Sequence, residues 1–261
     1  MTELTYGRYL KIDELLSLQQ PQSEPVEHDE VLFIIIHQVY ELWFKEVLHE
    51  LDELVEHLDD NRPALSGHQL KRVLKILKTL VAQLDVLETM TPLEFGSFRS
   101  FLASSSGFQS AQFREIEFVL GLKTRDHLDR FAANERELAN LSRRYHSPTL
   151  WDAFVAYLAR LGHDIPVEVL ERDVTLPGAE SPAVQQALLG IYRADADLAR
   201  LCESLTDLDE GFQEWRYRHM MMVHRTIGTK LGTGGSDGVD YLRSTLFRPA
   251  FPDLWSVRAL F

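Results

Sequence analysis

A histidine, several arginines and a glycine-rich loop are gathered near the carboxyl end of this 261-residue chain. His219 lies in a segment of helical periodicity, with Arg216 and Arg218 before it and three methionines at 220–222 after it. A neutral imidazole can ligate iron, methionines form an apolar wall, and arginines can pair with the carboxylates of a cofactor. The pattern is typical of the proximal side of a heme site, although bundle helices also carry such clusters. His219 is therefore the candidate iron ligand.

The neighbouring histidine and the loop have other interpretations. His224 lies five residues after His219, so the two cannot form the zinc-binding pair that requires an i, i+4 spacing. The loop at 230–238 contains four glycines, but it lacks the lysine of a phosphate-binding P-loop and follows a helix. A loop that closes over a substrate, with the Thr233 hydroxyl facing it, fits better. A plain connection between helices is the alternative.

Two further side chains could bind a small molecule. His37 lies in an apolar helical segment with Phe33 one turn before it, where a neutral imidazole would form a hydrogen bond in a pocket. A core histidine satisfied by a backbone carbonyl is the alternative, and the sequence alone favours it. Arg99 shares a helix face with Phe95, which would suit the carboxylate and ring of an aromatic amino acid. A surface arginine in a salt bridge is the alternative.

Long helices must position these residues. Apolar residues recur at intervals of three and four over 26–59 and again over 66–89. The sequence TPLE at 91–94 reads as a capping box with proline at the first helical position, which predicts a short helix reaching 102. Further helices are predicted from about 108, after the SP pair at 147–148, and over 182–205 and 208–230.

The segment 173–182, with two prolines and a glycine, is the predicted linker between helices. We find no strand of period two and no internal repeat. The predicted fold class is therefore all-α: residues 1–261 form a single domain whose long helices make a bundle.

Composition excludes several classes of protein. Forty acidic against 27 basic residues argue against a nucleic acid or an anionic membrane as partner. Cys202 is the only cysteine, so no disulfide can form within the chain and no CxxCH motif can attach heme covalently. The N-terminus lacks the apolar core of a signal peptide, and the longest apolar run, 31–36, is too short to span a bilayer. We expect a soluble, cytoplasmic protein.

Six segments, in the same order along the chain, together resemble the tryptophan 2,3-dioxygenase family. They are LTYGRYLKIDELL (4–16), HDEVLFIIIHQVYELWFKEVLHEL (28–51), TPLEFGSFRSFL (91–102), SSGFQSAQFREIEF (105–118), WRYRHMMMV (215–223) and GTGGSDGVDYL (232–242). The match is weakest between about 122 and 206.

The resemblance implies a heme b cofactor, ferrous in the active state, and an all-α fold around it. By position in the WRxRH segment, His219 is the implied axial ligand of the iron. Ser106 and Gly107 match the loop that covers the distal face of the heme.

The resemblance also implies how L-tryptophan binds. His37 is implied to hydrogen-bond the indole N–H, with Phe33 lining the pocket. Arg99 is implied to bind the substrate carboxylate, and Thr233 to meet both its ammonium and its carboxylate. Phe95 matches an aromatic position of the pocket that is tyrosine in some members, so this chain keeps the ring and lacks the hydroxyl.

Family members are homotetramers in which the N-terminal segment of one subunit reaches into a neighbour's pocket. Tyr6, Tyr9 and Leu10 match the residues that do so, and residues 1–20 are the implied arm. The apolar and aromatic N-terminus fits this role, since a free tail is usually polar.

The implied reaction inserts both atoms of O2 across the indole C2–C3 bond of L-tryptophan to give N-formyl-L-kynurenine, in the kynurenine pathway of tryptophan catabolism. One alternative is a heme-dependent mono-oxygenase of a substituted tryptophan or another aromatic amino acid. A second is a heme-binding or sensory helical protein without turnover, which would need His219 but neither Arg99 nor the glycine loop.

Overall fold

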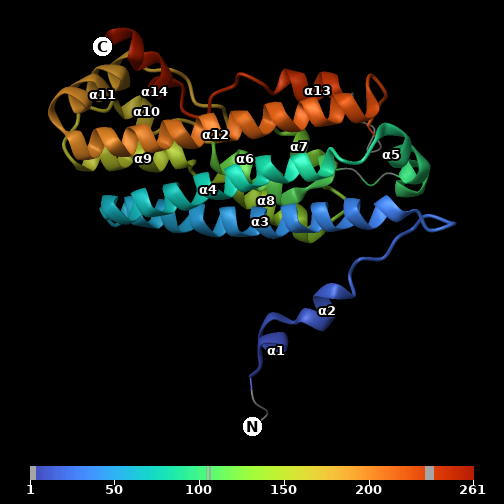
Figure 1. Cartoon of the computed structure of the whole chain (residues 1–261). Helices are drawn as coiled ribbons and strands as arrows, with labels where there is room; N and C mark the ends of the chain where they lie inside the picture. Colours follow the sequence, from blue (N-terminus) through green and yellow to red (C-terminus); the bar gives the residue numbers. More distant parts are fainter. Residues whose placement is uncertain (1–3, 104, 106, 233–237) are drawn as a thin grey trace.

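In the computed structural model of the protein, residues 4–103, 105, 107–232 and 238–261 are described. Every regular element among them is a helix, which confirms the predicted all-α class. Two helices of 32 residues each, α3 (His28–Asp59) and α12 (Ala196–Ile227), form the frame. The 25-residue helix α4 (Pro63–Leu87) packs along both of them. Figure 1 shows these three helices as long rods lying side by side.

Shorter helices surround this frame. In chain order they are α1 (Tyr6–Leu10), α2 (Ile12–Leu16), α5 (Pro92–Phe98), η1 (Arg99–Leu102), η2 (Gly107–Gln109), α6 (Ala111–Val119), α7 (Asp126–Arg130), α8 (Glu135–His146), α9 (Leu150–Arg160), α10 (Val167–Leu170), α11 (Pro182–Ala194), α13 (Val239–Ser244), α14 (Pro252–Ser256) and η3 (Val257–Leu260). The first two extend away from the packed helices (Figure 1).

The core lies along the shared faces of α3, α4 and α12. Leu51, Leu54 and Leu80 are fully excluded from solvent. Gly211 brings α12 close to α4, because a Cβ atom at this position would lie 2.9 Å from the Cδ1 atom of Leu74. The apolar periodicity of α3, α4 and α12 thus produces one continuous packed interface between these three helices.

The predicted capping box at the start of α5 is confirmed. The Thr91 hydroxyl accepts from the backbone N–H of Glu94 (3.3 Å), and the Glu94 carboxylate accepts from the backbone N–H of Thr91 (2.6 Å). Pro92 occupies the first turn. The α-helix ends at Phe98, and the 3-10 turn η1 continues the segment to Leu102.

The predicted boundary between the last two long helices was wrong. The break falls at Asp195, not between 205 and 208, because its carboxylate accepts from the backbone N–H groups of Asp197 (3.1 Å) and Leu198 (2.9 Å). Apolar residues keep a helical spacing on both sides of Asp195, so periodicity alone passes through this cap.

The cap of the helix predicted after 147–148 was placed at Ser147, two residues before the actual cap at Thr149. Thr149 forms the capping box of α9 with Asp152. The Ser147 hydroxyl instead donates to the carbonyl oxygen of Arg143 (2.7 Å) and so belongs to the end of α8.

Throughout the described part of the chain, no helix is both long and apolar enough to cross a membrane.

Candidate active site

A cavity with about 1510 Å³ of empty volume, its open mouth included, lies where α3 begins and α12 ends. Its lining is mainly aromatic and aliphatic, and includes Phe33, Tyr40, Phe44, Leu84, Leu87, Met90, Phe95, Leu102, Phe108, Phe113, Trp215, Met222, Val223 and Ile227. Ionisable side chains also face it: His37, Glu41, Arg99, Arg114, Glu117, Arg216, His219 and Tyr241.

His219 enters the cavity from α12. Its ring stacks on the indole of Trp215 one turn earlier, with centroids 5.1 Å apart and planes 4° apart. Burial, with smaller contributions from the nearby His37 and Arg114, lowers the pKa of His219 to about 4. No hydrogen bond to this ring is formed within the described part of the chain. His219 is therefore a neutral imidazole, held in orientation and available as a ligand.

His37 enters the same cavity from α3. Its Nδ1–H donates to the carbonyl oxygen of Phe33 at 2.7 Å. Because a carbonyl can only accept, the proton is on Nδ1 and the Nε2 atom is left as an acceptor. Burial lowers the pKa of His37, against opposite contributions from the Phe33 carbonyl and Glu41. The backbone carbonyl expected of a core histidine is thus present, and the His37 ring nevertheless lines the cavity.

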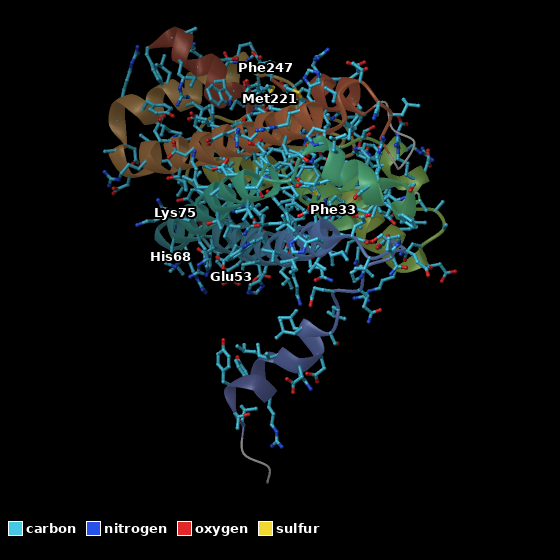
Figure 2. All side chains as sticks on the ribbon, turned by 45° about the vertical axis from the view of Figure 1, so that its right-hand side comes forward. Phe33, Glu53, His68, Lys75, Met221 and Phe247 are labelled. Carbon is cyan, nitrogen blue, oxygen red and sulfur yellow. The ribbon has the colours of Figure 1, made fainter. Side chains whose placement is uncertain are left out.

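An aromatic wall adjoins His37. The ring of Phe33 lies 4.1 Å from the His37 ring, 5.7 Å from Phe95 and 5.6 Å from Phe98, between centroids. Phe33 is labelled on α3 in Figure 2. The capping box of α5 fixes where Phe95 and Phe98 meet α3. The structure thus brings the predicted pocket residues His37, Phe33 and Phe95 together.

Arg99 lies beside the start of the glycine loop. Its Nη2 atom donates to the carbonyl oxygen of Leu231 at 2.5 Å, directly before Gly232. Gly107, Gly232 and Gly238 also line the cavity. The predicted Ser106 and Thr233 lie outside the described residues.

The structure does not bring the predicted N-terminal residues to this chain's own cavity. Tyr6 is 76%, Tyr9 72% and Leu10 41% exposed. All three residues lie on α1, in the segment that extends away from the packed helices (Figure 1).

The arginines around His219 have partners that the sequence did not reveal. Arg218 forms ion pairs with Asp85 and Glu88 near the end of α4, and Arg225 forms one with Glu88. Only Arg216 faces the cavity, so the expectation that the arginines together meet a cofactor's carboxylates was wrong for Arg218.

The expected methionine wall is also reduced. Met222 lines the cavity and Met220 is buried outside it, whereas Met221 is 39% exposed. Met221 is labelled at the outer surface of α12 in Figure 2. One turn of helix cannot direct three consecutive side chains to the same side.

Sequence reasoning missed a buried charged cluster on the cavity wall. Arg114 and Glu117 lie one turn apart on α6, with the Nη1 atom of Arg114 2.5 Å from a carboxylate oxygen of Glu117. Arg216 forms an ion pair with the other oxygen of Glu117, and its Nη1 atom donates to the carbonyl oxygen of Thr245 at 2.8 Å. Charged residues at helical spacing inside an otherwise apolar segment were the available signal.

Fold and cavity together define a class: an all-helical protein with a large, mainly apolar cavity that two neutral imidazoles enter. The family described as tryptophan 2,3-dioxygenase matches residues 1–149 and 132–261. The chain is 58% identical to the tryptophan 2,3-dioxygenase of Herpetosiphon aurantiacus over 98% of both chains. It is 54% identical to that of Anaeromyxobacter dehalogenans, covering 98% of this chain and 95% of the relative. For Caulobacter vibrioides the identity is 45% over 98% of both chains.

The chain therefore belongs to the tryptophan 2,3-dioxygenase family. The match includes the region between 122 and 206, where the sequence motifs had given the weakest resemblance.

Proposed function

We propose that the protein is a heme-dependent dioxygenase that inserts both atoms of O2 across the indole C2–C3 bond of L-tryptophan, giving N-formyl-L-kynurenine. The observation that carries the proposal is one cavity lined by His219 from α12, His37 from α3 and Arg99 beside the glycine loop. Membership of the tryptophan 2,3-dioxygenase family supports the substrate and the reaction.

The residues that line the cavity fit a non-covalent heme b, which would be ferrous in the active state. Apolar and aromatic side chains suit the faces of a porphyrin, and the neutral His219 imidazole would supply the axial ligand. The stacked Trp215 ring would fix the plane of that imidazole. When bound, the heme supplies the iron that activates O2. We assign the loop with Ser106 and Gly107 to its distal face.

L-Tryptophan would bind beside His37. The Nε2 atom of His37 can accept the indole N–H, because the Phe33 carbonyl holds the proton of the ring on Nδ1. Phe33 and Phe95 would contact the indole ring. Arg99 would pair with the substrate carboxylate, and Thr233 would meet the ammonium and carboxylate. A substrate without a carboxylate would leave the Arg99 guanidinium without an anionic partner.

Residues 1–261 would form one heme dioxygenase domain, since α3, α4 and α12 share one core. We further propose a homotetramer in which residues 1–20 reach into the cavity of a neighbouring subunit. Tyr6 and Tyr9 expose aromatic rings that a second subunit would cover. The single cysteine, Cys202, is a buried free thiol, which suits the cytoplasm, where tryptophan catabolism would take place.

Product identification tests the proposal. The protein is reduced without oxygen, then given L-tryptophan and O2, and the mass of the product is measured. Addition of two oxygen atoms supports the dioxygenase. Addition of one would identify a mono-oxygenase, and a Soret band without turnover would identify a heme-binding protein; either outcome overturns the proposal.

A further inference from the structure

The two imidazoles of the cavity are held in different ways. The Nδ1–H of His37 donates to the Phe33 carbonyl oxygen at 2.7 Å, so a hydrogen bond fixes the plane of that ring. Within the part of the chain that the structure describes, no hydrogen bond reaches the His219 ring. Its partner is the Trp215 indole one turn earlier on α12, with centroids 5.1 Å apart and planes only 4° apart.

This stacking contact is what can keep the His219 ring in one orientation. The torsion that turns a histidine ring about its Cβ–Cγ bond is soft, because torsions between sp3 and sp2 atoms have broad minima. Without a hydrogen bond, such a ring keeps one plane only where a neighbour packs against its face. Residues four apart on a helix are neighbours, so Trp215 is placed to be that neighbour for His219.

Aromatic side chains from two other helices hold the Trp215 ring in its turn. Its centroid lies 4.8 Å from that of Phe113 on α6, and 6.3 Å and 6.1 Å from those of Tyr40 and Phe44 on α3. The Phe44 ring meets the indole edge-on, at 86°. Trp215 is only 6% exposed. Close packing of this kind leaves a side chain a single rotamer, so the indole is a fixed surface for His219.

Tyr40 connects this support to a third helix. Its hydroxyl donates to the Leu80 carbonyl oxygen on α4 at 2.6 Å. Burial raises the pKa of Tyr40, against smaller opposite contributions from the Trp215 indole N–H and Arg218, so the phenol keeps the proton that it donates. The indole N–H, although near the Tyr40 hydroxyl, forms no hydrogen bond of normal geometry among the described residues. Packing alone therefore sets the position of the Trp215 ring.

We propose that Trp215 is a positioning residue for the iron ligand: its packed indole sets the plane of the His219 imidazole and so the angle at which that imidazole meets the bound heme. The inference rests on the heme site of the proposed function and assigns the residue through which α3, α4 and α6 fix its ligand. An imidazole that is already restricted loses less freedom when the heme binds. Trp215 thus strengthens heme binding through His219, without ligating iron.

The Raman band of the iron–histidine stretch tests this role, because its width reports the range of orientations that the ring adopts. Full-length, heme-loaded protein is reduced without oxygen before the spectrum is taken. We expect Trp215→Met to widen the band by at least about half, since the ring then samples its broad torsional minimum. Heme transfer to excess apomyoglobin, followed at the Soret band, should be about two- to tenfold faster, as loss of an aromatic pair predicts. Trp215→Phe retains a ring and should restore both values.

Control variants separate positioning from a structural role. Trp151 is equally buried, at 5% exposure, but packs on Phe154 and Phe251 outside the cavity. Trp151→Met should lower the free energy of unfolding in urea as Trp215→Met does, and leave the band unchanged. Phe113→Leu removes a ring that holds Trp215. It should widen the band in part, and it tests the role even where Trp215→Met does not fold.

Several outcomes would overturn the assignment. One is a band of parental width in Trp215→Met, or in Phe113→Leu where Trp215→Met does not fold. Another is equal widening by Trp151→Met. A parent that forms N-formylkynurenine while Trp215→Met keeps the parental band and rate of heme loss retains the proposed function and loses this positioning role. A parent that binds no heme loses both.

Discussion

Replacing Arg99 by methionine tests how the substrate carboxylate is bound. The structure sets the starting point, because Arg99 already donates to the Leu231 carbonyl oxygen at 2.5 Å. Binding the substrate exchanges that contact for a paired contact with a carboxylate. Hydrogen bonds to charged groups contribute about 1.5–3 kcal/mol each. Two are gained and one is lost, so the net contribution is about 1.5–3 kcal/mol.

A free energy of about 2 kcal/mol corresponds to roughly a 30-fold change in affinity. We therefore expect Arg99→Met to raise KM for L-tryptophan by about that factor. Heme content and the Soret band should stay unchanged, because Arg99 donates to the Leu231 carbonyl oxygen and makes no contact with His219, the implied iron ligand.

The assay is steady-state formation of N-formylkynurenine, with tryptophan binding measured separately on the cofactor-loaded protein. Arg225→Met serves as the matched control, since Arg225 pairs with Glu88 and does not line the cavity. A KM for Arg99→Met within twofold of the parent would refute the reasoning. So would an equal effect of Arg225→Met.

Further predictions concern both histidines of the cavity and the stability of the fold. His219→Ala should purify without a Soret band while its circular dichroism remains helical; retained stoichiometric heme would remove His219 as ligand. His37→Ala should keep its heme and lose at least about tenfold in kcat/KM, since the acceptor for the indole N–H is gone; unchanged turnover would contradict that role. Asp209 accepts the backbone N–H groups of Ala250 (2.9 Å) and Phe251 (3.2 Å) and the indole N–H of Trp255 (2.9 Å), so Asp209→Ala should lose about 2–4 kcal/mol in urea unfolding, and Asp209→Asn less. Because the folded-state pKa of His127 is lowered to about 4, its contribution to stability is present above its unfolded value near 6.5 and is lost as pH falls from there towards 4. Unfolding free energy should drop by up to about 2 kcal/mol across that window, and His127→Gln should flatten the drop.

Local signals in the sequence were sufficient for much of the fold. The capping box at Thr91 and the apolar periodicity of α3 predicted elements that the structure contains. Both depend on residues at most one or two turns apart. The helix boundary at Asp195 was not predicted for the same reason. An aspartate can also lie within a helix, and no neighbouring residue marks Asp195 as a cap.

The candidate site was predictable where its members share a helix, and less so where they do not. Phe33 and His37 lie four residues apart on α3, and their proximity follows from helix geometry. The pairing of Glu117 with Arg216 joins residues 99 positions apart, which no spacing rule anticipates. Arg218 was misread because its partner Asp85 lies on α4.

The position of the cavity explains why the long helices extend well beyond the site. A cavity costs free energy because its walls lose packing contacts, roughly 24 cal/mol per Å³ in core mutants. In this fold the cavity is lined by α3 between Phe33 and Phe44 and by α12 between Trp215 and Ile227, whereas Leu51, Leu54 and Leu58 are buried in the second half of α3. That half of the bundle stays close-packed against α4 and can keep the cavity walls in register before any ligand arrives. His37 and His219 then line one cavity because the packed half of the bundle holds α3 and α12 in place, not because a contact within the site joins them.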